Sequence, residues 1–206
     1  ADLTGVDLNS VDLSGAELTG ATLTGAVLTG ANLTGADLTG ATLTNVNSGG
    51  ITATGTPPTL PTDWKLINGY LVGSGADLTN ADLTGADLTG VYLSGVDLSG
   101  AELTGATMTG VSSGQITGAP LNLPAGWQLF GGYLIGPGAD LSLADLTGVD
   151  LAGVKSGGIT ATGTPPTLPT DWKLINGYLV GPSADLASAT LTGATLTGAT
   201  LTSADL

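Results

Sequence analysis

Apolar and polar residues alternate along most of this chain with a period of five. Residues 1–45 read ADLTG, VDLNS, VDLSG, AELTG, ATLTG, AVLTG, ANLTG, ADLTG and ATLTN, and the period returns in blocks 76–110, 139–153 and 184–206. We number the positions of each pentapeptide as slots one to five. Slot one is Ala or Val, slot three is Leu except at Met108, slot four is mostly Thr or Ser, and slot five is mostly Gly.

A period of five does not match a helix. Five residues advance about 140° around an α-helix, so the leucines would spiral over its whole surface. In an extended chain, slots one and three point to one face, and slots two and four point to the other. Glycine in slot five then allows the chain to turn a corner. The pattern therefore predicts short extended sides that wind into a coil, with stacked coils burying a column of Ala and Leu.

The repeated run A(D/N)L(S/T)G resembles the pentapeptide-repeat proteins over well over half of the chain. This resemblance implies an all-β fold, a right-handed quadrilateral parallel β-helix (a β-solenoid) with four pentapeptides per coil. Leu3, Leu23 and Leu43 would then stack on one side. We expect residues 1–206 to form a single β-helix domain. Because the chain begins and ends inside a repeat, we also expect this rod to be part of a longer array.

The period breaks in three inserts, residues 46–75, 111–138 and 154–183. The first and third share the sequence GGITATGTPPTLPTDWKLINGYLVG, and the middle insert is a shorter, divergent copy. Their prolines prevent a regular β-ladder. Because the inserts follow one design, we expect the three loops to stack on one side of the rod.

One tryptophan occupies the equivalent point of each insert: Trp64, Trp127 and Trp172. The simplest interpretation is that each indole lies against the flank of the column and staples its loop. The alternative is an aromatic platform that binds a sugar or a protein partner, for which these three residues are the candidate loop contacts.

The chain is strongly acidic, with 17 Asp and Glu, three Lys and a net charge of −14. Fifteen of the acids occupy slot two and should point outward. If the inserts align with one another, one side carries an acidic stripe of Asp12, Asp77, Asp97, Asp140, Asp185 and Asp205. The adjoining side then carries Glu17, Asp37, Asp82, Glu102 and Asp145.

Three hypotheses account for these acids. The first is a solvated surface that keeps the rod soluble. The second is calcium binding between stacked carboxylates, since calcium prefers oxygen ligands. The third comes from the family resemblance, which implies an acidic mimic of DNA acting on a DNA-binding protein such as gyrase.

The side that begins at Ala1 is predicted to carry paired outward threonines, interrupted by Asp2, Asp87 and Asp150. The pairs are Thr22 with Thr24, Thr42 with Thr44, Thr107 with Thr109, and Thr195 with Thr197. Such rows resemble the surface of ice-binding β-solenoids, which makes ice binding an alternative function. Threonine is also a good outward strand residue, and this face could pack against a second copy.

Composition narrows the chemistry further. The absence of Cys and His excludes thiolate and histidine-based catalytic or metal sites. Three lysines are too few for binding a nucleic acid backbone, and there is no long apolar or basic amphipathic stretch for membrane insertion. We therefore predict no enzyme activity and no cofactor, and we assign no residue as a metal ligand, with calcium binding by the stacked acids left as the hypothesis above. The sequence favours a structural or interaction scaffold whose partner is a protein or a second copy. The scarcity of cationic residues and cysteine suggests an extracellular or cell-surface location.

Overall fold

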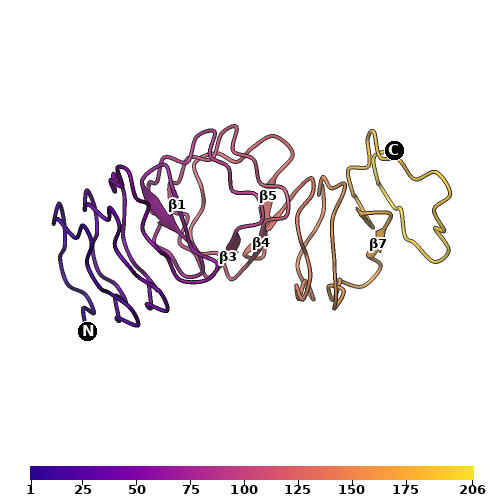
Figure 1. Cartoon of the computed structure of the whole chain (residues 1–206). Helices are drawn as coiled ribbons and strands as arrows, with labels where there is room; N and C mark the ends of the chain where they lie inside the picture. Colours follow the sequence, from indigo (N-terminus) through magenta and orange to yellow (C-terminus); the bar gives the residue numbers. More distant parts are fainter.

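The computed structural model describes residues 1–206, and all of its regular secondary structure is β-strand and bridge. The chain forms coils stacked along an elongated rod, with the two termini at opposite ends (Figure 1). Parallel bridges join residues of neighbouring coils, such as Asp2 with Thr22 and Thr22 with Thr42. The fold is therefore a β-helix, as the five-residue period predicted.

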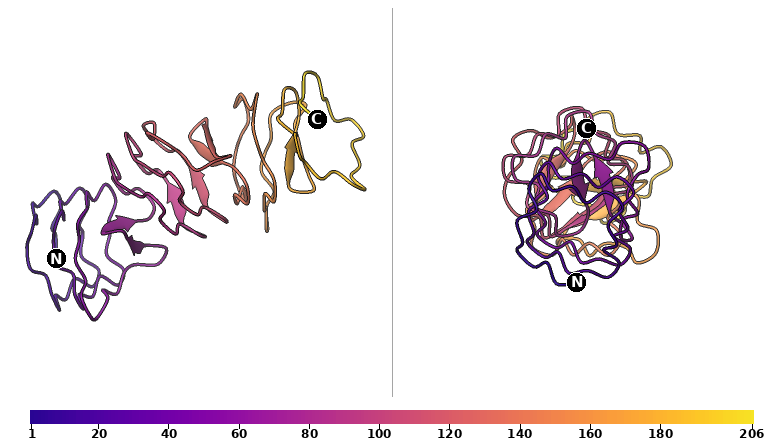
Figure 2. Two further views of the ribbon diagram at one scale, coloured as in Figure 1. Left: turned by 90° about the horizontal axis from the view of Figure 1, so that it is seen from above. Right: turned by 60° about the vertical axis from the view of Figure 1, so that its left-hand side comes forward.

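Four bridged positions follow one another in the first coil, and each begins a ladder that defines one side of the rod. We name these sides by their first members: Asp2 for side 1, Asp7 for side 2, Asp12 for side 3 and Glu17 for side 4. Side 2 has the longest ladder, which runs through Asp7, Val27, Asn47, Asp77, Asp97 and Thr117. In the right-hand view of Figure 2 the coils overlap around a shared interior.

Slot five forms the corners, because its residues adopt the left-handed conformation. Gly5 has φ 65°, and non-glycine residues in this slot keep the same conformation, with φ 58° at Ser10 and 56° at Asn45. The next slot-one N–H closes the turn on the preceding slot-three carbonyl, at 3.1 Å from Val6 to Leu3. Slots one and three consequently face inward. The leucines of the inner coils, such as Leu33, are fully buried.

Eight short strands form four two-stranded sheets. The pair β3–β4 is parallel and belongs to the ladder of side 1, and the other three pairs are antiparallel hairpins, one in each insert. The strands are β1 Lys65–Ile67, β2 Tyr70–Val72, β3 Tyr92–Ser94, β4 Ser112–Gly114, β5 Gln128–Phe130, β6 Tyr133–Ile135, β7 Lys173–Ile175 and β8 Tyr178–Val180.

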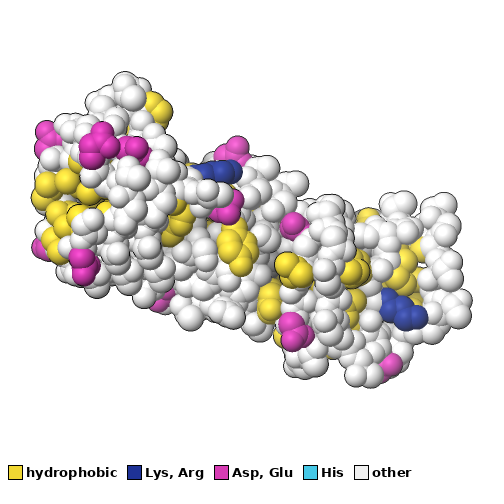
Figure 3. Space-filling view, turned by 60° about the horizontal axis from the view of Figure 1, so that its bottom comes forward, with side chains coloured by type: hydrophobic (Ala, Val, Ile, Leu, Met, Phe, Trp, Pro, Cys, Tyr) yellow, Lys and Arg dark blue, Asp and Glu magenta, His cyan; other side chains and the backbone are white.

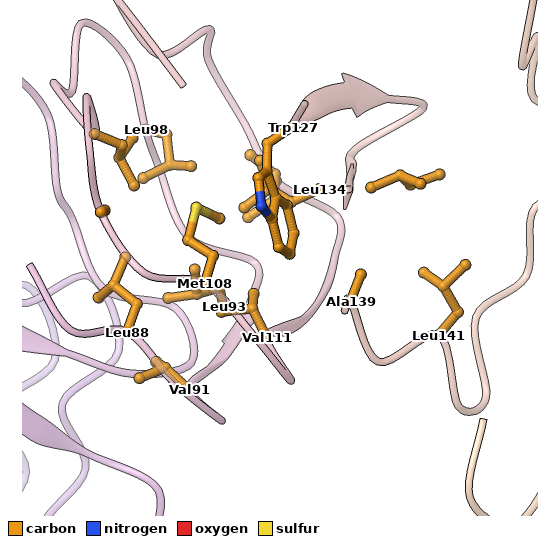
Figure 4. Packing of buried hydrophobic residues seen from close by; sticks show 14 of the residues in the cluster. Leu88, Val91, Leu93, Leu98, Met108, Val111, Trp127, Leu134, Ala139 and Leu141 are labelled. Atoms are coloured by element: carbon orange, nitrogen blue, oxygen red, sulfur yellow. The ribbon is translucent and has the colours of Figure 1, made fainter. Parts of the chain in front are cut away.

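The hairpins enter the hydrophobic core. Leu71 and Val72 of β2 are fully buried. The hydrophobic core consists of two clusters, one of 14 buried residues that includes Leu71 and one of 31 that includes Val72. Trp64 packs against both clusters. Figure 4 shows Trp127 and Leu134 of the second hairpin region among buried residues of neighbouring coils. Each insert therefore returns to the column, as its sequence suggests, and it does so through a hairpin, which was not predicted.

Each insert completes a single coil, although it is longer than four pentapeptides. Asn47 pairs with Asp77, 30 residues later, and both lie on side 2. Lys155 pairs with Asp185 on side 4. The residues in excess of a regular coil form the proline-containing loop and the hairpin.

The three hairpins lie on different sides of the rod. The Tyr hydroxyl of each hairpin accepts a backbone N–H from the next coil: Asp82 on side 3, then Asp145 on side 2, then Thr190 on side 1. Each hairpin is thus rotated by one side from the one before. The prediction that the loops stack on one side was wrong, because successive inserts begin on different sides, at Asn47, Ser112 and Lys155.

Candidate functional site

The predicted acidic stripe is spread over all four sides. Its six members separate as Asp140 on side 1, Asp77 and Asp97 on side 2, Asp12 on side 3, and Asp185 and Asp205 on side 4. The predicted adjoining side divides as Asp145 on side 2, Asp82 and Glu102 on side 3, and Glu17 and Asp37 on side 4. Figure 3 shows acidic side chains scattered along the visible face. The stripe prediction was wrong because it assumed aligned inserts.

Most slot-two acids accept a hydrogen bond from the slot-four N–H of their own pentapeptide and so stabilise its turn. The Asp2 carboxylate accepts the Thr4 backbone N–H at 3.0 Å and the Thr4 hydroxyl at 2.7 Å. Asp37 accepts the backbone N–H of Thr39 in the same way, at 2.9 Å. These hydrogen bonds stabilise the ionised form, so they lower the pKa of both carboxyls below the usual value near 3.8. The acids therefore have a local structural role that is independent of any ligand.

Asparagine side chains connect to several of the acids across coils. The Asn32 amide donates to Asp12 at 3.0 Å, and the Asn122 amide donates to Glu102 at 2.7 Å. No three residues of the types Asp, Glu, His or Cys gather in an arrangement that could hold a metal ion. Calcium binding and DNA mimicry stay predictions.

The predicted threonine row is also divided. Thr22 and Thr42 stack on side 1 above Asp2, whereas Thr107 pairs with Asp87 on side 4. Thr195 follows Thr190 in the last coil and lies on side 2. Only two of the four predicted threonine pairs therefore stack on the expected side, and the single-face assignment of Thr22, Thr24, Thr42, Thr44, Thr107, Thr109, Thr195 and Thr197 was wrong. Ice binding stays a prediction without that extended row.

Each tryptophan lies over a glycine of its own insert. Trp64 covers Gly73, and the other two pairs are Trp127 with Gly136 and Trp172 with Gly181, so closely that a Cβ at any of these glycines would overlap the ring. Trp127 is only 8% exposed, and the other two indoles are half-buried. All three contact the core, which matches the predicted position against the column. The stapling of the loop by the ring stays a prediction.

The three hairpin tips meet their coils through one set of hydrogen bonds. At the first junction, the Ser48 hydroxyl accepts the Leu71 N–H at 2.9 Å and the Gly69 carbonyl accepts the Ile51 N–H at 3.0 Å. At the other two junctions, the hydroxyls of Ser113 and Ser156 accept the equivalent leucine N–H groups. These shared contacts allow the junctions to be compared position by position.

The second junction alone opens into a hollow, a cavity of about 410 Å³ on side 1. At the first junction, the Asn47 amide bridges the coils to Asp77 at 2.9 Å, and at the third, the Lys155 ammonium reaches Asp185 at 3.0 Å. The equivalent residue at the second junction is Ser112, whose hydroxyl makes no hydrogen bond to Asp140; that carboxylate is bonded only by Ser142. We call this cavity the hollow. Its lining is Tyr92, Ser94, Ser112, Ser113, Gly114, Gln115, Tyr133, Asp140, Ser142, Leu143 and Ala144.

Asp140 is the only lining residue of the hollow that was predicted from the sequence to lie on a candidate surface. Two signals were present, since the middle insert is the divergent copy and Tyr92 is the only aromatic residue in slot two. Neither shows that residues of three coils and a hairpin tip meet. The structure also contains no helix with the length and hydrophobicity needed to span a bilayer.

Comparisons with known proteins agree with the repeat architecture. The family profile described as pentapeptide repeats matches residues 12–47, 74–110 and 183–206 in eight copies. These segments fall on regular coils and leave out nearly all of the three inserts. A search of curated protein sequences finds no match.

Several solved structures are similar to this chain, including the following two. One is HetL, a pentapeptide repeat protein involved in heterocyst differentiation regulation from the cyanobacterium Nostoc sp. strain PCC 7120, with 25% identity and a TM-score of 0.22. That match covers 90% of this chain and 60% of HetL, so the chain spans less than two thirds of HetL. The other is QnrB1, a plasmid-mediated fluoroquinolone resistance protein, with 15% identity, a TM-score of 0.24, and coverage of 97% and 78%.

Proposed function

We propose that this chain, which belongs to the pentapeptide-repeat family, is a non-enzymatic structural or interaction scaffold. In this proposal it is a right-handed, four-sided β-helical rod with three loop-bearing inserts. Its partner is a protein or a second copy of the chain.

The proposal rests on one observation: within each pentapeptide, different slots form the buried core and the outer surface. Slots one and three supply the buried column, as Ala31 and Leu33 do in the second coil, both fully buried. Slots two and four face outward and contribute to the turn rather than to the core. Outward side chains can therefore vary without loss of buried apolar area, which suits a surface that binds partners.

The charges support a binding role better than a catalytic one. A general acid at neutral pH needs a raised pKa, which usually comes from burial. In this chain, all nine carboxyls with a shifted pKa are shifted downward, mainly because of hydrogen bonds from neighbouring N–H and hydroxyl groups. These carboxyls are therefore ionised at neutral pH and accept hydrogen bonds from nearby groups of the chain.

The experiment combines shape with surface mutagenesis. Small-angle scattering should show an elongated particle for the parent and for a variant with Thr22→Lys and Thr42→Lys on side 1. A protein bound by the parent and released by this variant, or self-association lost in it, would support the scaffold. A second variant, Asp77→Asn with Asp97→Asn on side 2, identifies which side is used. A compact particle, or a partner and oligomeric state that no outward substitution affects, would contradict the proposal.

A further inference from the structure

The hollow at the second junction goes beyond the scaffold function, because it combines two tyrosine rings with several unpaired polar groups. Tyr92 is 43% exposed, and neither its hydroxyl nor the Ser94, Ser112 and Gln115 side chains make a hydrogen bond within the chain. One oxygen of Asp140 accepts the Ser142 N–H at 2.9 Å, and its other oxygen stays unpaired. The hollow thus offers hydroxyl, amide and carboxylate groups beside aromatic surface.

Two residues of the second junction differ from their equivalents at the first junction, and both changes open the surface. Tyr92 stands where the first junction has Val27, and Ser112 stands where it has the bridging Asn47. The tyrosine adds an exposed ring to the cavity that Asp140 lines. The serine leaves Asp140 without the amide donor that Asp77 has at the first junction. Together they convert a bridged surface into a cavity.

Two corners at the rim of the hollow differ in the same direction. Gln115 replaces Gly50 and Gly158 of the other junctions, and Leu143 replaces Asn80 and Ser188. Leu143 has φ 64° and is 76% exposed, so it combines an unfavourable backbone conformation with an unfavourable apolar exposure. Such unfavourable features occur where a site is formed at the expense of stability.

The chemistry of the lining selects the ligand class. The hollow contains one carboxylate and no cation, within a chain of net charge −14, which disfavours an anionic ligand. A quaternary ammonium would use the rings and the carboxylate but would leave the hydroxyl and amide groups unpaired. A sugar uses the aromatic surface and the polar groups together. Its C–H face packs on an aromatic ring, while its hydroxyls pair with serine, amide and carboxylate groups.

We propose that the hollow formed by Tyr92, Ser112, Gln115, Tyr133, Asp140 and Leu143 binds a terminal residue of a neutral carbohydrate. Tyr92 forms the exposed stacking surface. The free Asp140 oxygen accepts a sugar hydroxyl, and the serine hydroxyls and the Gln115 amide pair with the others. Tyr133 is a positioning residue, because its ring packs on Gly114 and its hydroxyl holds the Asp145 N–H at 3.2 Å.

The test uses the whole chain on immobilised oligosaccharides that end in glucose, galactose, mannose or N-acetylglucosamine, with sialylated and sulfated glycans as anionic comparisons. Titration calorimetry then measures the dissociation constant for any glycan retained. Binding to at least one neutral glycan, in preference to the anionic set, is expected. No binding at millimolar concentration, or selective binding of the anionic set, would overturn the proposal.

Three substitutions locate the site. Ser112→Asn should bridge Asp140 as Asn47 bridges Asp77, and Tyr92→Val restores the residue of the first junction. Each should weaken binding by about tenfold or more, because each removes a strong polar contact or the stacking surface. Leu143→Gly should weaken binding while raising the melting temperature, a combination that a purely structural role does not produce. The matched control, Asp87→Asn on side 4, should leave the dissociation constant unchanged.

A converse variant tests sufficiency. Val27→Tyr with Asn47→Ser should create a second hollow at the first junction and raise the stoichiometry toward two. All of these variants keep residues that the fold already accepts at equivalent positions, so circular dichroism should match the parent. Glycan binding that survives Tyr92→Val combined with Ser112→Asn would show that the hollow is not the site and would overturn the proposal. The scaffold proposal would be unaffected, since its test measures protein partners on sides 1 and 2.

Discussion

The first and second hairpin junctions share a backbone arrangement but differ at the surface. In both, a serine hydroxyl accepts a leucine N–H and a tyrosine hydroxyl accepts an N–H of the next coil, at 3.2 Å in each case. In the first, Asn47 closes the space beside Asp77; in the second, Ser112 leaves it open. The contacts that seat a hairpin in the column are therefore separate from those that shape its outer surface.

The buried part of the second junction should be the most sensitive to mutation. Trp127→Ala removes an indole that is only 8% exposed, and should lower the free energy of unfolding by about 3–5 kcal/mol. Urea denaturation measures the loss. Trp64→Ala is the matched variant at the first junction and should cost less, because that ring is half-buried. Equal losses would mean that burial of the indole does not decide its contribution.

A regular coil supplies the next comparison. Leu33→Ala should destabilise the rod by about 2–5 kcal/mol, because the side chain is fully buried and the stacked coils cannot collapse around the cavity. Leu196→Ala in the last coil is the control, since Leu196 is 36% exposed. If thermal unfolding shows comparable losses for both, the buried column would not be the main source of stability.

Acid should weaken the regular coils through their slot-two carboxylates. Hydrogen bonds from slot four lower the folded-state pKa of Asp37, Asp82 and Asp145 below the unfolded value near 3.8. Their contribution is therefore fully present above that value and is lost as pH falls through the lower folded pKa. Melting temperatures should fall steeply below about pH 4.

Asp37→Asn is the control for this acid sensitivity. Asn32 already accepts the slot-four N–H of Thr34 at 3.0 Å, so an asparagine at 37 can keep the turn without titrating. The variant should show a shallower loss at low pH. An unchanged pH profile would mean that this carboxylate does not contribute to the acid sensitivity.

Opening the first junction should have a smaller effect. Asn47→Ser removes the amide that donates to Asp77 and should cost about 0.5–1.5 kcal/mol. Burial raises the pKa of Asp77, and hydrogen bonds from Thr79 and Asn47 outweigh it to give a net lowering. Loss of the Asn47 bond should therefore raise this pKa, which an NMR titration of the carboxyl carbon measures. An unmoved pKa would contradict the bridging role.

The smallest change, and the only gain, is expected at the rim of the hollow. Leu143→Gly should raise the free energy of unfolding by about 1 kcal/mol, because glycine adopts φ 64° without the cost that a leucine side chain brings. Asn80→Gly at the first junction is the matched control and should gain less, since asparagine tolerates this conformation better. A loss of stability in Leu143→Gly would mean that the Leu143 side chain has a packing role.

The repeating unit of this protein can be derived from the sequence alone. Within one pentapeptide, the inward position of Leu33, the outward position of Asn32 and the left-handed corner at Gly35 all depend on neighbours in the chain. A five-residue pattern records such local requirements directly, because each repeat must satisfy them again. The β-helix and the match to the pentapeptide-repeat profile followed from that pattern.

Which repeats share a side depends on the tertiary structure. It is set by how many residues of each insert lie outside the regular coil, in the loop and the hairpin. The hairpin tips are held by contacts with the coils, such as Gly69 with Ile51 and Tyr70 with Asp82. Asp77 and Asp140 consequently lie on different sides, although their pentapeptides read alike. The hollow has the same origin: Tyr92, Ser112 and Asp140 meet because three coils stack, and Tyr133 joins them because a hairpin tip lies between two of those coils.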